Sequence, residues 1–398
     1  MKTAGIVAEY NPFHNGHLYH IEETKKAGYD YIVSVMSSNV VQRSEVSSFS
    51  KWTRASMAVK SGVNLVVELP AVYSVAGAEK FAFAGVSILN ALGVVDALSF
   101  GSELGEISPL LKCADACSSP EVSKKMLDFL NDGITYAKAR EKAVGALHGT
   151  EISKLLRTPN NILAIEYLKA IKKLGCEMIP FTVKRKGAKH DSLVTSKKFA
   201  SATLIRERLY ENNIDALYDF IPNDAFKLLK DDFSSNGGIA FMGKLNELIL
   251  YKLRTMTPED FLSLPDVSEG LEYKLSSEAK KAVSVDDFLT RVKTKRYTLS
   301  RIKRIIMYAL LDIKKEIIDT PPPYIRILAF DEKGQKLLKK AKQKASLPIY
   351  HSFAKLQKDF PLLAEKEALA TDLFRYACPK IPDANSEYSD KSPFCLIK

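Results

Sequence analysis

The sequence predicts an α/β fold with a doubly wound parallel sheet, followed by a mainly helical C-terminal region that contains a small α/β element. Two observations support this prediction. Short apolar runs alternate with amphipathic or alanine-rich runs up to about residue 211, and helical periodicity dominates from about residue 212 to 320. Regular alternation of this kind is typical of Rossmann-like sheets with helices on both faces. We therefore expect one domain over residues 1–211 and a second over 212–398.

The first region supplies the expected strands and helices in order. The opening strand is the apolar run Ala4–Ala8, which a turn connects to an amphipathic helix. Later strands are expected at 31–36, 65–70, 97–103 and 177–184, with helices at 18–26, 51–60, 76–92 and 160–175. Residues 104–158 are typical of a helical insertion. Ligands of such sheets bind at the carboxyl ends of the strands, which are expected here near Asn11, Ser37, Pro70 and Gly101.

The second region is expected to be helical until three consecutive prolines, Pro321–Pro323, form a stiff joint. Helices are predicted at 246–254, 271–283 and 301–318. After the prolines we expect a strand at 324–330, a basic helix at 333–344, a strand at 347–351 and a helix at 355–378. The tail after Pro379 is expected to be loosely ordered.

Composition favours a polyanionic partner and a cytoplasmic location. The net charge is +11 and the pI is about 9.1, so we expect nucleic acid before an anionic membrane, although a merely basic enzyme stays an alternative. The five cysteines form no C-x-x-C pair, which indicates reduced thiols. No apolar run approaches the length of a membrane span, and residues 1–30 lack the pattern of a signal peptide.

The stretch from Glu9 to His20 carries the strongest chemical signal. Here His14-Asn15-Gly16-His17 has the form H-x-G-H, after a first strand and at the start of a helix. Gly16 allows close approach of a ligand, and a helix start attracts phosphate. Two imidazoles there can donate hydrogen bonds to a leaving pyrophosphate, so we expect His14 and His17 to be catalytic. With His20 they also have metal-ligand spacing, but no thiolate or second carboxylate cluster completes a site, so no protein metal site is predicted.

A second candidate phosphate segment lies at Ser201, Thr203 and Arg206. Hydroxyl groups at a helix start and a fixed guanidinium suit a triphosphate. The alternative is a plain serine-capped helix.

A third segment, residues 293–304, is basic and contains no acidic residue. Charges for phosphate and a ring for base stacking are what single-stranded RNA requires. We therefore predict RNA contacts there, while a solvated helix start remains the alternative. The candidate RNA-binding residues are Lys295, Arg296, Tyr297, Arg301 and Arg304.

Taken together, these motifs resemble those of the tRNA(Met) cytidine acetate ligase family, within the nucleotidylyltransferase superfamily. The resemblance is carried by residues 9–17, 42–43, 51–55, 66–70, 100–103, 160–163 and 295–298. It implies a Rossmann-like sheet of the nucleotidylyltransferase type. It also implies an enzyme that forms acetyl-adenylate from acetate and ATP, then acetylates N4 of the wobble cytidine of elongator tRNA(Met). We expect Mg²⁺ to accompany ATP, held mainly by the nucleotide.

The resemblance and the second phosphate segment together define the expected ATP site. Its residues are Val7, Ala8, Glu9, Tyr10, Asn11, Pro12, Phe13, His14, Asn15, Gly16, His17, Leu18, Tyr19, His20, Gly101, Asn160, Arg185, Ser201, Thr203 and Arg206.

The chain departs from the family pattern at three places, namely Ser38, Ser44 and the loop Lys186–His190. The first two residues replace expected glycines, and these departures affect the expected acetate pocket.

Two other functions stay open. One is a small-metabolite adenylyltransferase, against which the basic C-terminal half argues. The other is a non-catalytic RNA-binding protein, against which both histidines and Gly16 argue.

Overall fold

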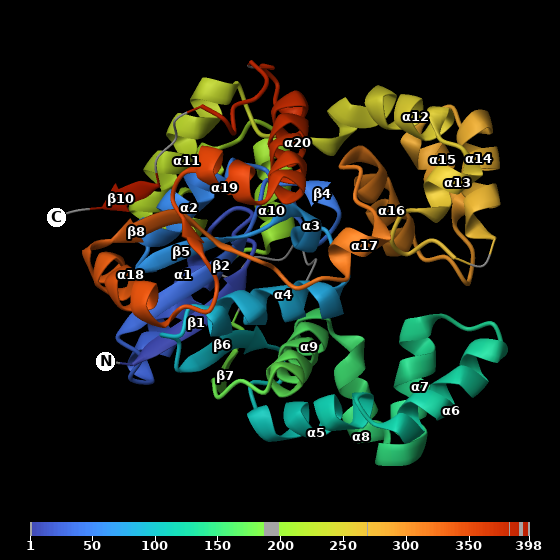
Figure 1. Cartoon of the computed structure of the whole chain (residues 1–398), viewed down its shortest axis with the longest axis horizontal. Coiled ribbons are helices and arrows are strands. Elements are labelled where there is room, and N and C mark those ends of the chain that lie inside the picture. The colour runs from blue at the N-terminus through green and yellow to red at the C-terminus, as the bar shows by residue number, and fades with distance from the viewer. Residues whose placement is uncertain (1, 187–198, 269, 382, 390–392, 397–398) are drawn as a thin grey trace.

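The computed structural model describes residues 2–186, 199–268, 270–381, 383–389 and 393–396. Its centre is a sheet with the strand order β10-β8-β5-β2-β1-β6-β7, and β9 pairs with β8 (Figure 1). Five strands run parallel in the predicted manner. They are β1 (Thr3–Ala8), β2 (Tyr31–Ser37), β5 (Leu65–Leu69), β6 (Ala97–Ser102) and β7 (Ile179–Lys184).

Alternate residues of the central strand β2 face two different cores. Val33 and Val35 pack in one apolar cluster with residues of α4 (Ala78–Ala91) and α9 (Pro159–Leu174). Ile32 and Met36 pack in another, with residues of α1 (Asn15–Lys26) and α2 (Lys51–Lys60). Burial on both faces is typical of parallel sheets covered by helices. The predicted doubly wound fold is therefore confirmed.

Helices form two further groups beside the sheet (Figure 1). The predicted insertion contains α5 (Ile107–Cys117), α6 (Pro120–Asn131), α7 (Tyr136–His148) and α8 (Thr150–Lys154), with a 3₁₀ turn at Leu155–Arg157. After β7 come α10 (Ala202–Tyr210) and α11 (Asn223–Asn236), which pack on the main body in the core cluster of α1 and α2. The second group follows them and contains α12 (Asn246–Thr255), α13 (Pro258–Leu262), α14 (Leu271–Lys281), α15 (Val285–Val292), α16 (Leu299–Leu310) and α17 (Lys315–Ile318). Short 3₁₀ turns lie at Asp215–Phe220 and Met242–Leu245.

The remaining elements are short or lie near the C-terminus. A two-stranded hairpin, β3 (Val40–Val41) and β4 (Glu45–Val46), follows β2, and α3 (Ala71–Ser74) follows β5. The last part of the chain forms β8 (Ile325–Asp331), α18 (Glu332–Lys344), β9 (Ile349–Tyr350), α19 (Phe353–Asp359), α20 (Pro361–Ala377) and β10 (Phe394–Leu396).

The structure corrects three of these element predictions. The helix predicted at 301–318 is two helices, because Asp312 adopts a left-handed φ of 49° after α16. The helix predicted at 355–378 is also two, because Pro361 has no N–H to continue α19 and begins α20 instead. The tail expected to be loosely ordered contains β10 and the buried Glu387.

The sheet also crosses the domain boundary predicted at residue 211. Strand β8 pairs antiparallel with β5, and β10 pairs with β8. Both strands belong to the second predicted domain, so strands from both regions complete one sheet. The functional division at residue 211 stays a prediction.

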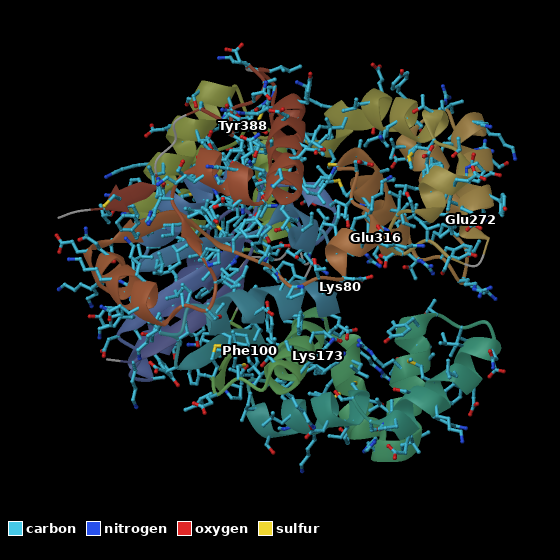
Figure 2. The ribbon with its side chains drawn as sticks, in the orientation of Figure 1. Lys80, Phe100, Lys173, Glu272, Glu316 and Tyr388 are labelled. Atoms are coloured by element: carbon cyan, nitrogen blue, oxygen red, sulfur yellow. The ribbon has the colours of Figure 1, made fainter. Side chains whose placement is uncertain are left out.

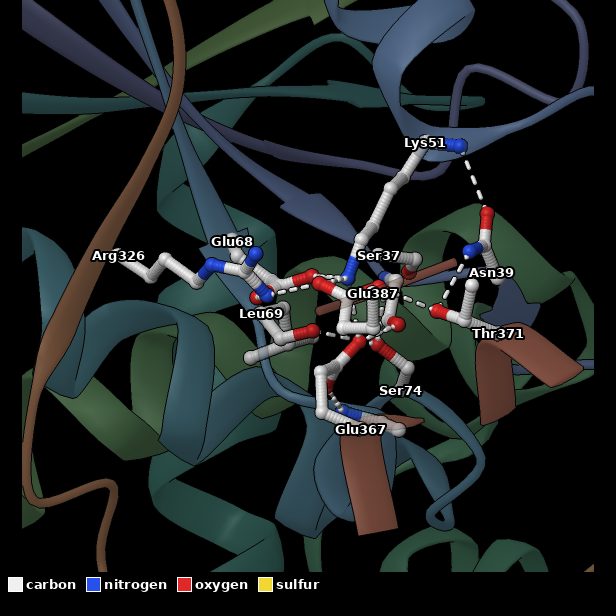
Figure 3. A network of polar contacts seen from close by, with 12 residues as sticks. Ser37, Asn39, Lys51, Glu68, Leu69, Ser74, Arg326, Glu367, Thr371 and Glu387 are labelled. Atoms are coloured by element: carbon white, nitrogen blue, oxygen red, sulfur yellow. Dashed lines mark hydrogen bonds and ion pairs between the residues drawn. The ribbon is translucent and has the colours of Figure 1, made fainter. Parts of the chain in front are cut away.

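A buried ionic cluster joins the C-terminal segments to the sheet (Figure 3). Lys51 Nζ lies 2.9 Å from carboxylate oxygens of both Glu367 and Glu387, and it also pairs with Glu68. Arg326 pairs with Glu68 at 3.1 Å and with Glu387. Burial opposes the ionisation of Glu387, but the charges of Arg326 and Lys51 outweigh it and lower the pKa to about 2. The cluster therefore connects α2, β5, β8, α20 and the tail.

Candidate active site

The two histidines of the H-x-G-H motif cap the start of α1. The backbone N–H of Gly16 donates to His14 Nδ1 at 3.0 Å, and the backbone N–H of His14 donates to His17 Nδ1 at 3.2 Å. Because each Nδ1 accepts a hydrogen bond, a neutral ring must carry its proton on Nε2. The rings stack with centroids 3.8 Å apart. The local sequence therefore sets the tautomer of both rings and leaves each Nε2–H as a donor.

The surroundings keep these rings neutral. Burial, followed by the charges of Arg185 and Arg206, lowers the pKa of His14 to about 3. Burial is also the largest cause that holds the pKa of His17 well below its usual value, and it lowers the pKa of His20 to about 4, again with Arg185 contributing. At neutral pH all three rings are uncharged, and they lie among cations that attract a polyanion.

The histidines line a cavity of about 400 Å³ at the carboxyl ends of β1, β6 and β7. Four cationic side chains line this cavity, whereas Glu9 is the one carboxylate among its described lining residues. Such a charge balance suits a ligand with several negative charges. The cationic residues are Arg43, Arg185, Lys186 and Arg206.

Most of the residues predicted for the ATP site line this cavity. They are Val7, Ala8, Glu9, Tyr10, Asn11, His14, Gly16, His17, Tyr19, His20, Gly101, Asn160, Arg185, Ser201, Thr203 and Arg206.

Four predicted residues do not lie among the lining residues: Pro12, Phe13, Asn15 and Leu18. Phe13 is fully buried in the core, and Leu18 packs against the same core cluster. Asn15 Nδ2 donates to the backbone carbonyl of Asp219 at 2.8 Å. Residues 7–20 are continuous in sequence, but only some of them line the cavity, and others pack behind it. Within α1 this happens because successive residues of a helix point in different directions.

In the second phosphate segment, Ser201 both caps a helix and lines the cavity, so both predictions made for it apply. Ser201 caps α10 by accepting a hydrogen bond from Leu204 N–H at 3.1 Å, as in the simple capping alternative. It also lines the cavity with Thr203 and Arg206. Arg206 donates to the backbone carbonyl of Asn11 at 3.1 Å. The start of α10 and the turn after β1 therefore lie together, although about 190 residues separate them in the sequence.

Gly101 and Asn160 are held beside Arg185 by close packing and by an acidic cap. A Cβ on Gly101 would lie 3.3 Å from Arg185 Cγ, so a larger residue would push this guanidinium-bearing chain away. Glu103 accepts hydrogen bonds from Asn160 Nδ2 at 2.7 Å and from the backbone N–H of Asn161 at 2.7 Å. These contacts fix the start of α9 against the end of β6.

Sequence reasoning missed the apolar wall of the cavity and the hairpin residues that line it. Phe100, labelled in Figure 2, lines the cavity with side chains from α4 and α9. No local pattern distinguishes these side chains from ordinary core residues. The available signal for Gln42 and Arg43 was their position a few residues after β2, although the short strand β3 lies between. The missed residues include Phe81, Phe100, Ile162, Leu163 and Tyr167, together with Gln42, Arg43 and Lys186.

Arg54 fixes the strand ends beside the cavity. Its buried guanidinium donates to the backbone carbonyls of Phe49 at 3.0 Å, Glu9 at 2.6 Å and Ser37 at 3.1 Å, and also to that of Ser38. Burial lowers the pKa of Arg54 to about 9, which opposes but does not prevent its charge at pH 7. Arg54 is therefore a positioning residue for the carboxyl ends of β1 and β2.

The predicted RNA segment lies near the cavity, but two of its arginines are engaged within the protein. Arg301 Nε donates to the backbone carbonyl of Asp266 at 2.7 Å, and Arg304 pairs with the Asp266 carboxylate at 2.6 Å. Arg304 Nε lies 4.0 Å from the position of a Cβ on Gly77, next to the lining residue Ala78. Lys295 and Arg296 are exposed, and Tyr297 is half-buried with Arg301 over its ring.

A second cavity of about 750 Å³ lies between α4, α7, α9 and residues 318–320. Lys80 and Lys173, labelled in Figure 2, line it. Lys80 pairs with Asp319, Lys169 with Glu166 at 2.7 Å, and Lys173 Nζ lies 4.9 Å from the Phe83 ring. Since acidic partners neutralise much of its charge, this cavity suits a polyanion less well than the histidine cavity.

Several properties of the described residues bear on the remaining predictions. Across these residues no group of three or more His, Cys, Asp or Glu side chains is placed to hold a metal ion. No helix in the described part of the chain has the length and apolarity to cross a bilayer. All five cysteines are free thiols. In the loop Lys186–His190, where the sequence departs from the family pattern, only Lys186 belongs to the described residues.

Comparison with known proteins identifies the family. A family model described as HIGH Nucleotidyl Transferase matches residues 1–389. The chain is 41% identical over 385 residues to the tRNA(Met) cytidine acetate ligase of Thermoanaerobacter sp. (strain X514), covering 95% of this chain and 96% of the relative. It is 42% identical to that of Caldanaerobacter subterraneus subsp. tengcongensis, with the same coverage.

Solved structures agree with this result. The apo structure of Thermotoga maritima TmcAL matches over 100% of both chains with a TM-score of 0.94 and 33% identity. The structure of the same protein bound with alpha-thio ATP matches over 100% of both chains with a TM-score of 0.92 and 32% identity. This chain therefore belongs to the tRNA(Met) cytidine acetate ligase family, within the HIGH nucleotidyl transferases.

Proposed function

We propose that this protein forms acetyl-adenylate from acetate and ATP and transfers the acetyl group to N4 of the wobble cytidine of elongator tRNA(Met), giving N4-acetylcytidine. Two relatives that carry the name of this ligase support the proposal, as does a related structure bound with alpha-thio ATP. The observation that carries it is the pair of neutral histidines, His14 and His17, with their Nε2–H donors in a cationic cavity.

In the first step, an acetate oxygen attacks the α-phosphorus of ATP and pyrophosphate leaves. We assign the triphosphate to the starts of α1 and α10, where Ser201, Thr203 and Arg206 meet the histidines. The Nε2–H groups of His14 and His17 then donate to phosphate oxygens on which charge builds. Gly101, Asn160 and Arg185 would hold the nucleoside part of ATP, beside the apolar wall from α4 and α9.

In the second step, N4 of cytidine attacks the acetyl carbonyl carbon, AMP leaves and N4 loses a proton. The RNA must therefore deliver one base to the cavity. We assign RNA contacts to Lys295, Arg296, Tyr297, Arg301 and Arg304, because α16 lies beside Gly77 at the border of the cavity. The internal hydrogen bonds of Arg301 and Arg304 leave part of each guanidinium for phosphate.

The cavity residues are a poor match for a protein-held Mg²⁺. Glu9 is the one carboxylate among the described lining residues, and its Oε1 already accepts a hydrogen bond from Gln42 N–H at 2.8 Å. A Mg²⁺ that enters with ATP would be held by triphosphate oxygens and water, as this ion commonly is.

Incubation of the protein with labelled acetate and ATP, with and without elongator tRNA(Met), tests the proposal. We expect acetate-dependent exchange of pyrophosphate into ATP without tRNA, and labelled tRNA when tRNA is present. AMP transfer to a phosphorylated metabolite instead would indicate a small-metabolite adenylyltransferase. RNA binding without acetate chemistry would indicate a non-catalytic protein. We assign the protein to the cytoplasm, where ATP and tRNA are available and free thiols stay reduced.

A further inference from the structure

The β3–β4 hairpin connects the cavity to the face that carries the basic segment. It leaves the carboxyl end of β2, and its turn residues Gln42 and Arg43 line the cavity. Val41 pairs with Glu45, and Ser44 takes a left-handed φ of 61°, so the chain turns sharply between the two short strands. Figure 1 shows β4 on the side of the main body that faces α16.

Contacts on both sides hold this hairpin in place. Inside the cavity, Glu9 Oε1 accepts a hydrogen bond from Gln42 N–H at 2.8 Å. On the outer side, Glu45 lies 3.6 Å from Lys303 of α16, and Val46 N–H points to Met242 Sδ at 3.4 Å. The hairpin is therefore fixed at its tip to Glu9, the residue that follows β1, and at its base to the helical region.

The arginines around the cavity lie in two different settings. Arg185 directly follows β7 and Arg206 belongs to α10, and both line the cavity with His14. Arg43 comes from the hairpin and is exposed at the edge of the cavity, on the side fixed to α16. Arg206 suits the triphosphate and Arg185 the nucleoside part of ATP, whereas Arg43 is placed for a ligand that enters from outside.

The proposed reaction determines what such a ligand must be. N4 of one cytidine has to reach the adenylate inside the cavity, as in enzymes that turn a base out of its stack. The phosphates next to that nucleotide must then stay at the edge of the cavity. An arginine at that edge can make charge-assisted, bidentate hydrogen bonds to a phosphate oxygen pair.

We infer that Arg43, at the tip of the β3–β4 hairpin, contacts a backbone phosphate beside the acceptor cytidine and positions the base in the cavity. This inference rests on the proposed function. It adds a positioning residue for the RNA that neither the basic segment nor the ATP site includes, and it explains why one hairpin contacts both regions.

Three variants and two readouts test the inference. Arg43→Ala removes the contact, Arg43→Lys keeps the charge without the bidentate geometry, and Lys60→Ala is a matched control. Lys60 is an exposed cation at the end of α2, just before β5 begins, so it lies near the amino end of that strand, away from the cavity at the carboxyl ends. The readouts are acetyl transfer to elongator tRNA(Met) from preformed adenylate in a single turnover, and tRNA affinity as a function of salt.

We expect Arg43→Ala to slow acetyl transfer by about tenfold or more, because one charge-assisted contact is lost. The slope of log affinity against log salt should fall by about one, as for one lost phosphate contact. Arg43→Lys should keep the salt slope but transfer more slowly than wild type, and Lys60→Ala should match wild type in both readouts.

Acetate-dependent exchange of pyrophosphate distinguishes a role of Arg43 in RNA contact from a role in acetate or ATP binding. If Arg43→Ala slows this exchange as much as it slows transfer, Arg43 serves acetate or ATP and the inference is wrong. Unchanged transfer and salt slope in Arg43→Ala also overturn it. If wild-type protein itself shows no acetate-dependent exchange, the proposed function fails, and the inference fails with it.

Discussion

The donors of the candidate site depend on two local hydrogen bonds. His14 and His17 each use Nδ1 to accept a backbone N–H at the start of α1, which leaves their Nε2–H groups as the remaining donors. A protonated Nδ1 would remove that acceptor, so the same contacts favour neutral rings. Burial favours neutrality as well. Capping through Nδ1 thus sets the catalytic Nε2–H donor on the same two rings.

His14→Ala and His17→Ala should each reduce acetyl-adenylate formation by about 10²–10³-fold, the usual cost of one lost donor to a developing oxyanion. Acetate-dependent pyrophosphate exchange measures this effect. tRNA binding should stay close to wild type, because the predicted RNA residues lie on other elements. His148→Ala is the matched control, since His148 is exposed in the last turn of α7. Normal adenylate yield from both variants would contradict the assigned roles.

The neutral histidines should also make stability fall in acid. His20 lies with Nε2 2.9 Å from Ser99 Oγ, and burial and Arg185 lower its pKa to about 4. A histidine whose pKa falls on folding binds fewer protons in the native state, so stability rises with pH between about 4 and 6.5. At pH 5, His20 should cost on the order of 1–2 kcal/mol of unfolding free energy relative to pH 7.

Urea unfolding at pH 5 and pH 7 measures this dependence. His20→Gln removes the titrating group, so its loss of stability between pH 7 and pH 5 should be smaller than that of wild type. This comparison is independent of any change in stability that the substitution causes at both pH values. An equal pH dependence in the two proteins would rule out the role assigned to His20.

At the scale of elements, α2 holds the strand ends that form the cavity. Lys51, in its first turn, enters the buried cluster with Glu68, Glu367 and Glu387. One turn later Arg54 binds carbonyl groups at the ends of β1 and β2. The sequence motif around Trp52 therefore has a positioning role, which its composition alone did not reveal.

Lys51→Met should destabilise the protein by about 3–5 kcal/mol, because it leaves buried carboxylates without a cation that compensates them. Lys26→Met is the control, since Lys26 is 71% exposed and solvent screens its pair with Glu23 at 2.8 Å, so its loss should change stability little. Urea unfolding at pH 7 measures both. Similar midpoints for Lys51→Met and wild type would mean that the cluster contributes little to stability.

At the scale of the whole molecule, local signals predicted the sheet and much of the cavity. The five parallel strands and the H-x-G-H turn follow from neighbouring residues, which is why short windows of sequence identified them. The hairpin strands are only two residues each, below the length that a pattern can reveal. Strand β8 joins the sheet by pairing with β5, far away in sequence, and β10 joins it by pairing with β8. Nothing local in the tail indicated that Glu387 would be buried against Lys51.

Long-range pairing of this kind predicts how a truncated chain should behave. A fragment of residues 1–211 lacks β8, so β5 loses its antiparallel neighbour. In the same fragment Lys51 keeps Glu68 but loses Glu367 and Glu387, and Glu68 loses Arg326. An unpaired edge and an incomplete buried cluster both oppose folding. We expect this fragment to unfold without a cooperative transition and not to bind ATP.

Circular dichroism in urea and ATP titration of the fragment and the full chain measure these properties. A chain that ends at residue 381 is the intermediate control, because it loses Glu387 and β10 but keeps β8, Glu367 and Arg326. We expect it to unfold cooperatively at a lower urea concentration than the full chain, since Arg326 and Lys51 lose one carboxylate between them. Cooperative unfolding and ATP binding by residues 1–211 alone would instead establish the first region as an autonomous domain, with β8 as a dispensable addition to its sheet.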